Sequence, residues 1–143
     1  MATPPARPLV ELSWREHLEY VRQRRPFGAP DGSYRSHVIY LAGFDAGTRG
    51  ALLSGFREWL IPRADRGNNL VWSGLVLLIA FPDREQARHD LDDEDNTAAV
   101  TTLYDLLETF LTDRDGGLDG LHRIHVAYEE WLQRRRSQAG LGR

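Results

Sequence analysis

The chain contains no cysteine and no lysine. Without cysteine there can be no disulfide, no thiolate nucleophile and no thiolate metal ligand, and the composition suits a cytoplasmic protein. Without lysine there can be no Schiff-base or catalytic lysine. All 18 basic residues are therefore arginine. Two interpretations remain: the codon bias of a GC-rich genome, which the Ala, Gly and Asp content also fits, or selection for bidentate recognition of phosphate or carboxylate.

Long hydrophobic runs are also missing. The longest run, 70–81, is interrupted by Ser73 and Gly74 and is shorter than the roughly 20 residues that a membrane span needs. The first eight residues include three prolines and no apolar segment of a secretion signal. A net charge of −3 also argues against nonspecific nucleic-acid binding. We therefore expect neither a membrane nor a nucleic-acid partner.

Helical periodicity dominates the rest of the chain and predicts an all-α fold, a compact bundle of five to six helices. Ser13 and Glu16 form a capping-box pattern at the first helix start. The run 70–81 permits a strand through its β-branched residues, but its length favours a central apolar helix. We expect a flexible arm over 1–8, a single helical domain over 9–136 and a frayed tail over 137–143.

The residue patterns of catalytic and metal sites are weak. The turn 113–120 resembles a calcium loop, but neither register that starts at Asp113 or Asp115 supplies the required acid at position 12. His122, His125 and Glu129 could share one face of the last helix, yet zinc needs three or four ligands with supporting partners, and edge-of-core histidines are the simpler interpretation. We expect no metal, no cofactor and no catalytic residues.

The acidic segment 90–95 is the strongest candidate for function. It carries Asp90, Asp92, Asp93, Glu94 and Asp95. Carboxylates at a helix start are also favoured by the helix dipole, so a solvated cap is the structural alternative. A docking site for a basic protein partner is the functional one. Exposed ends of Trp59, Trp72 and Trp131 would add anchors, and we include Trp59 and Trp72 among the predicted partner-binding residues.

A resemblance emerges from the order of several motifs. They are Arg25-Pro26 and the segments 38–45 (VIYLAGFD), 55–60 (GFREWL), 69–72 (NLVW) and 103–111 (LYDLLETFL). Across about 14–112, this order resembles a family of small, mostly uncharacterised bacterial proteins that is common in actinobacteria, with "RPGMYLG", "FLxGY" and "FFxLLDEF" motifs. The chain departs from it after Pro26, where Met-Tyr-Leu-Gly is missing, and at Thr109, where an acid is expected. Some members are thought to be immunity proteins of polymorphic toxin systems.

These observations favour a non-enzymatic cytoplasmic protein-binding module, an immunity protein that covers a basic toxin domain with its acidic segment. An alternative is a structural or regulatory subunit that oligomerises through an apolar helix face. A third hypothesis is an enzyme that uses His122, His125 and Glu129.

Overall fold

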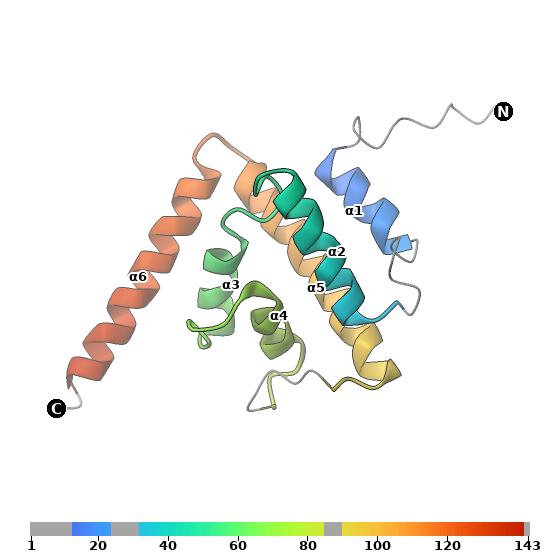
Figure 1. The fold of residues 1–143 in the computed structure, drawn as a ribbon. Coiled ribbons are helices and arrows are strands. Elements are labelled where there is room, and N and C mark those ends of the chain that lie inside the picture. The colour runs from blue at the N-terminus through green and yellow to red at the C-terminus, as the bar shows by residue number, and fades with distance from the viewer. Residues whose placement is uncertain (1–12, 24–31, 85–89, 142–143) are drawn as a thin grey trace, which may run out of the picture.

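The computed structural model describes residues 13–23, 32–84 and 90–141. These residues contain six helices and no strand (Figure 1), which confirms the all-α prediction. The helices are α1 (Trp14–Gln23), α2 (Tyr34–Gly47), α3 (Phe56–Ala64), α4 (Trp72–Ala80), α5 (Asp93–Asp115) and α6 (Gly120–Leu141). The arm predicted over 1–8 lies outside the described residues.

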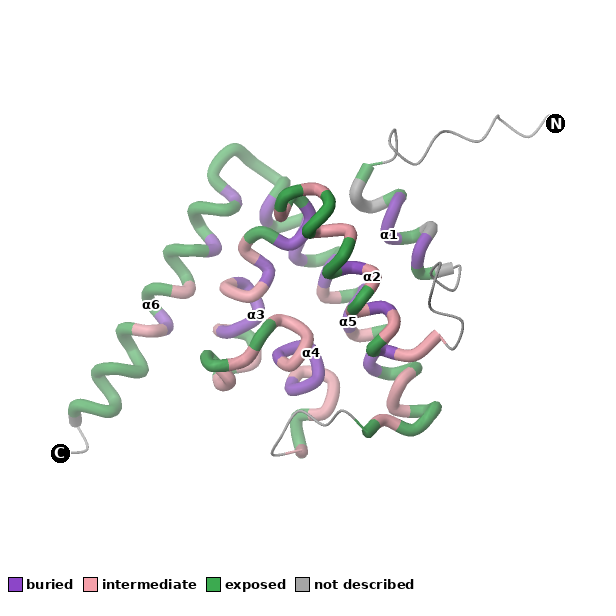
Figure 2. The backbone as a smooth tube through the Cα atoms, viewed as in Figure 1, coloured by how far each residue is buried: buried purple, intermediate pink, exposed green. Residues whose placement is uncertain are grey.

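Helix α5 occupies the centre of the molecule and packs against each of the other five helices. Its core face carries Leu103, Leu107 and Phe110, all fully buried, at the i, i+4, i+7 spacing of one helix face. The inward sides of the surrounding helices complete the core, as the purple segments of Figure 2 show. The long amphipathic helix, rather than the short α4 alone, therefore organises the bundle.

Most of the segment 70–81 forms a helix, as its length predicts, because α4 covers Trp72–Ala80. Helix α4 buries Leu75 and Val76 completely. The sharp turn before it requires Gly67, whose φ is +77° and where the Cβ of any other residue would lie 2.8 Å from a Leu78 methyl carbon. The side chain of Arg57 in α3 donates from Nε to the Leu70 carbonyl at 2.8 Å and so ties this turn to α3.

The start of α1 agrees in detail with its sequence signal, and the start of α2 is also capped by a serine. At α1, the Ser13 backbone N–H donates to Glu16 Oε2 at 2.9 Å, and the Glu16 N–H donates to Ser13 Oγ at 3.2 Å. This is the reciprocal pair of a capping box. At α2, Ser33 is the N-cap and accepts from the Ser36 N–H at 3.2 Å.

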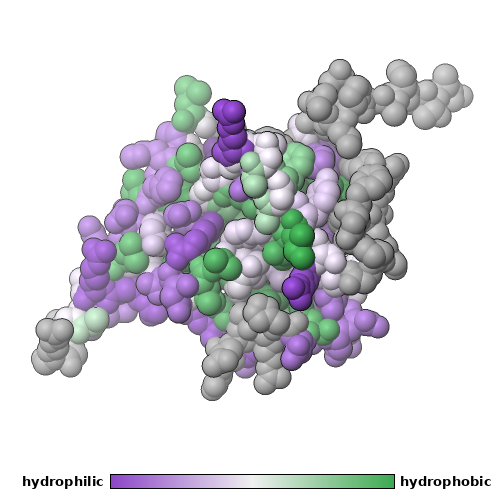
Figure 3. Space-filling model, in the orientation of Figure 1, coloured by the Kyte–Doolittle hydropathy of each residue, from purple (hydrophilic) through white to green (hydrophobic). Residues whose placement is uncertain are grey.

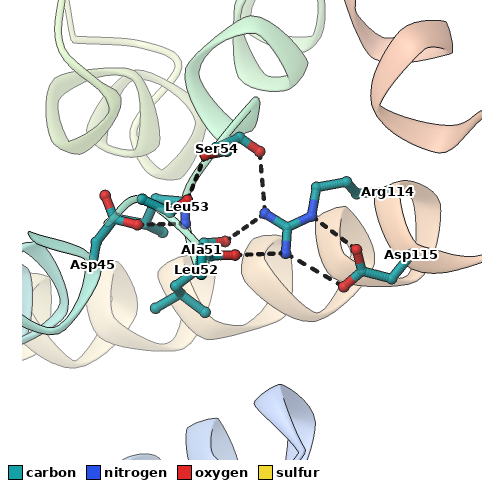
Figure 4. Close-up of polar contacts among 8 residues, drawn as sticks. Asp45, Ala51, Leu52, Leu53, Ser54, Arg114 and Asp115 are labelled. Atoms are coloured by element: carbon teal, nitrogen blue, oxygen red, sulfur yellow. Dashed lines mark hydrogen bonds and ion pairs between the residues drawn. The ribbon is translucent and has the colours of Figure 1, made fainter. Parts of the chain in front are cut away.

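Helix α3 begins at Phe56, although apolar residues at helical spacing start at Leu52. Leu52 and Leu53 are buried, but they lie in a turn that ends at Gly55, whose φ is +87°. The turn is held by Arg114, which donates to the carbonyls of Leu52, Ala51 and Ser54 at 2.8, 3.1 and 3.1 Å (Figure 4). Carbonyls that a continuous helix would bond internally are satisfied from α5 instead.

Helix α6 is the most exposed element of the described chain. Its side chains Ile124 and Trp131 are buried against the body of the molecule, and residues 133–140 are exposed throughout (Figure 2). The tail that we expect to fray from 137 is described as helical up to Leu141, where α6 ends. No strong helix breaker interrupts these residues before Gly140.

Candidate partner-binding surface

The acidic segment forms the start of α5. Asp92 is the N-cap, and its carboxylate accepts from the Asp95 backbone N–H at 2.7 Å. Asp93 and Glu94 follow in the first turn, where the helix dipole favours negative charge. The side chains of Asp90, Asp92, Asp93 and Glu94 are exposed, and we call these four residues the acidic edge. The carboxylates of the acidic edge therefore stabilise the start of α5 and still present negative charge to solvent.

Asp95 differs from the other acids because it has an internal partner. Its Oδ1 lies 2.9 Å from an Arg84 nitrogen, and its side chain is only 22% exposed. The Arg84 guanidinium in turn lies 4.1 Å from the centre of the Phe81 ring. The pair joins the chain that leaves α4 to the start of α5. Asp95 thus positions the acidic edge rather than forming part of it.

An apolar groove adjoins the acidic edge. It has a volume of about 700 Å³ and lies between α2 and α4, and we call it the α2–α4 groove. Its apolar lining comes from Val38, Ile39, Leu77 and Leu91. Leu91 stands between Asp90 and Asp92 in the chain, so one lining residue of the groove is the immediate neighbour of two residues of the acidic edge. Figure 3, viewed as in Figure 1, shows hydrophobic residues among neutral and hydrophilic ones on the face that holds α2 and α4, and mostly hydrophilic residues over α6.

Tyr34 holds the groove in shape. Its hydroxyl donates to the Ser73 carbonyl at 2.6 Å, which joins α2 to α4, and its backbone N–H donates to Asn96 Oδ1 at 2.8 Å, which joins α2 to α5. The Asn96 amide nitrogen donates to the carbonyls of Leu91 and Asp92, each at 3.0 Å. Burial raises the pKa of Tyr34, so the hydroxyl remains a donor.

Trp59 and Trp131 are buried away from solvent. Trp59 is 4% exposed, and its Nε1 donates to Asp113 Oδ2 at 2.8 Å. Asp113 lies twenty residues beyond Asp93 on α5, a distance of about 30 Å along the helix. Trp131 is 3% exposed and bonds Asp65, so the expected exposed ends of these two tryptophans are absent. Trp72 is half-buried, and its ring lies 5.8 Å from that of Phe56.

The histidines of α6 do not build a metal site in the structure. His122, His125 and Glu129 are exposed. Among the residues that the structure describes, no group of three or more His, Asp or Glu side chains is placed to hold a metal ion.

Sequence reasoning missed a second, buried group of histidines. His37 Nδ1 lies 2.7 Å from the Tyr104 hydroxyl, and the His17 ring stacks on Phe44 with 4.3 Å between ring centres. The members come from α1, α2 and α5, and His37 and Tyr104 are 67 positions apart. No short sequence motif signals such a pairing. The group is buried between helices, which is the position of a structural contact rather than of a surface site.

Comparisons of the chain with protein-family models, with curated proteins and with solved structures found no match. The geometry alone defines the class of protein, which is an all-α domain with an acidic edge beside an apolar groove. In the described part of the chain, no helix combines the length and the apolar character needed to cross a membrane.

Proposed function

We propose that the protein is a non-enzymatic binding module that docks a basic protein through its acidic edge. The observation that carries this proposal is the exposure of Asp90, Asp92, Asp93 and Glu94 directly beside the α2–α4 groove. Exposed carboxylates accelerate the approach of a basic partner, while a neighbouring apolar surface supplies affinity after contact. A surface with both parts suits protein recognition.

The sequence resemblance suggests which kind of basic partner this is. In an immunity protein, the acidic edge would cover the basic active site of a toxin in the cytoplasm and so exclude its substrate. Such occlusion needs a rigid, charged surface and no chemistry of its own. The proposal therefore assigns no catalytic residue and no cofactor to the chain.

Self-association through an apolar helix face has weaker support. Two exposed large apolar residues of α6, Leu121 and Val126, are 40% and 41% exposed. Because they are five positions apart, they point about 140° from each other around the helix. They do not form one continuous apolar stripe. Exposed apolar side chains also occur at the other candidate surface, where Ile39 is 61% exposed and lines the groove.

The test compares two variants with equal charge change. In the edge variant, Asp90→Asn, Asp93→Asn and Glu94→Gln remove three charges but leave the N-cap Asp92 in place. In the matched control, Asp119→Asn, Glu129→Gln and Glu130→Gln remove three exposed charges around α6. Both variants change the net charge from −3 to 0. A difference between them therefore reports where the charge lies and not how much of it the protein carries.

Each tagged protein is used to capture partners from a lysate of the cells that express it, with elution by steps of salt and quantitative mass spectrometry. We expect the wild type and the control to retain the same basic protein, and the edge variant to lose most of it. Equal retention by the edge variant, or recovery of the chain only as copies of itself, would contradict the proposal.

A further inference from the structure

We propose that the α2–α4 groove receives one large apolar side chain of the basic partner, from a segment in which lysine or arginine stands one or two positions away. The inference rests on the proposed function and specifies the chemistry of the partner's contact segment. Three observations support it: the apolar walls of the groove, the internal hydrogen bonds of several polar groups along its rim, and the position of Leu91 between two residues of the acidic edge.

Two large apolar side chains at or near the groove are exposed. Ile39 lines the groove and is 61% exposed, and Val71, just before α4, is 66% exposed. Leu77 on the opposite wall is 4% exposed. The groove volume of about 700 Å³ leaves room for a large side chain. An aliphatic or aromatic side chain seated there would remove Ile39 from water.

Several polar groups of the rim already have partners inside the protein. The Ser73 carbonyl accepts from Tyr34, and the Asn96 side chain bonds the backbones of Tyr34, Leu91 and Asp92. An apolar occupant therefore leaves these groups satisfied. Because the same bonds connect α2, α4 and α5, the groove keeps its shape before binding, which lowers the entropy lost when a partner binds.

The charge of the acidic edge determines which residues should flank the partner's apolar side chain. Leu91 belongs to the groove, and its chain neighbours Asp90 and Asp92 belong to the acidic edge. Consecutive Cα atoms are about 3.8 Å apart, so a cation one or two residues from the apolar anchor reaches these carboxylates. Among the described residues that line the groove, Arg35 carries the one charge. Arg35 repels a cation of the partner at its own end of the groove. The basic residue of the partner should therefore lie at the end of the groove where Leu91 is.

The experiment identifies its own ligand. A phage-displayed library of random 12-residue peptides is selected on the full chain, and the enriched peptides are synthesised with a fluorescent label. Their affinity is then measured by anisotropy at low and high salt against the wild type and three variants. Ile39→Gln makes the groove polar, Val126→Gln is the control at an exposed apolar position on α6, and the edge variant removes the three carboxylates.

We expect enriched peptides with a large apolar residue next to lysine or arginine. Ile39→Gln should weaken their binding about tenfold, and Val126→Gln should leave it unchanged. The edge variant should weaken binding chiefly at low salt. Peptides that need the carboxylates but not Ile39 would overturn the anchor and leave the proposed function standing. Peptides that need Ile39 but not the carboxylates, or a selection without enrichment, would overturn the basic flank and count against the proposed function as well.

Discussion

Arg114 gives the most quantitative prediction about stability. Its side chain is 8% exposed and donates to three carbonyls of the turn between α2 and α3 (Figure 4). We consider Arg114→Met, which keeps an unbranched apolar side chain and removes every donor. The carbonyl of Leu52 is buried, so the loss of its 2.8 Å bond to a charged donor should cost about 1.5–3 kcal/mol.

The remaining contacts of Arg114 add less. The carbonyls of Ala51 and Ser54 belong to exposed residues, where water can replace the lost donor at a cost of roughly 0.5 kcal/mol each. The partner Asp115 is 50% exposed, and exposed ion pairs contribute little. The free energy of unfolding should therefore fall by about 3 kcal/mol. For a domain of this size, that loss corresponds to a decrease in Tm of about 10 °C.

The assay is urea unfolding followed by circular dichroism, with the midpoint compared at constant slope. The matched control is Arg123→Met, which removes an arginine whose side chain is 62% exposed and whose partner, Asp119, is 67% exposed. We expect the control to match the wild type within error. If Arg114→Met and Arg123→Met shift the midpoint equally, the clamp is not a source of stability and the reasoning from buried carbonyls is refuted.

Three further predictions concern other contacts. Burial lowers the pKa of His17 from its ordinary value of 6.5, so the unfolded chain binds more protons than the folded one. The free energy of unfolding should therefore fall as the pH drops below 6.5 towards the folded pKa. His17→Phe should flatten this pH dependence in urea titrations at pH 5–8. Tyr34→Phe should cost about 1 kcal/mol by losing the bond to the Ser73 carbonyl, as measured by urea unfolding. Trp131→Ala should lower the free energy of unfolding by about 3–5 kcal/mol, because the side chain is buried. Deletion of 137–143 should leave the thermal midpoint unchanged, because 137–140 are exposed. Comparable losses of stability in the two variants would contradict the packing of α6.

Local signals in the sequence predict much of the fold. Three predicted features depend on residues within a few positions of one another. They are the Ser13–Glu16 capping box, the helix within 70–81 and the acidic start of α5. The start of α3 is different, because the turn before it is stabilised by Arg114, which lies about sixty positions away. In the sequence, Arg114 precedes Asp-Gly-Gly, a pattern that is typical of a surface turn. The spacing of Arg114 from Leu103, Leu107 and Phe110 is the one signal that places its side chain on the core face of α5.

The candidate surface is predictable only in part. The acidic edge is visible in the sequence because its charges are nearly consecutive. The α2–α4 groove is not, because Ile39, Leu77 and Leu91 come from three separate segments that only the packed helices bring together. The burial of Trp59 likewise depends on Asp113, 54 positions away. Exposure of an aromatic ring is a property of the packed structure, and composition does not determine it.

The most direct test of the account is the association rate of the captured partner with the wild type and the edge variant, measured over a range of salt concentrations. We predict that the wild-type rate falls steeply as salt increases, and that the edge variant associates more slowly with a shallower salt dependence. The α6 charge control should follow the wild type. Identical rates and salt dependences for all three proteins would contradict the claim that the acidic edge guides binding.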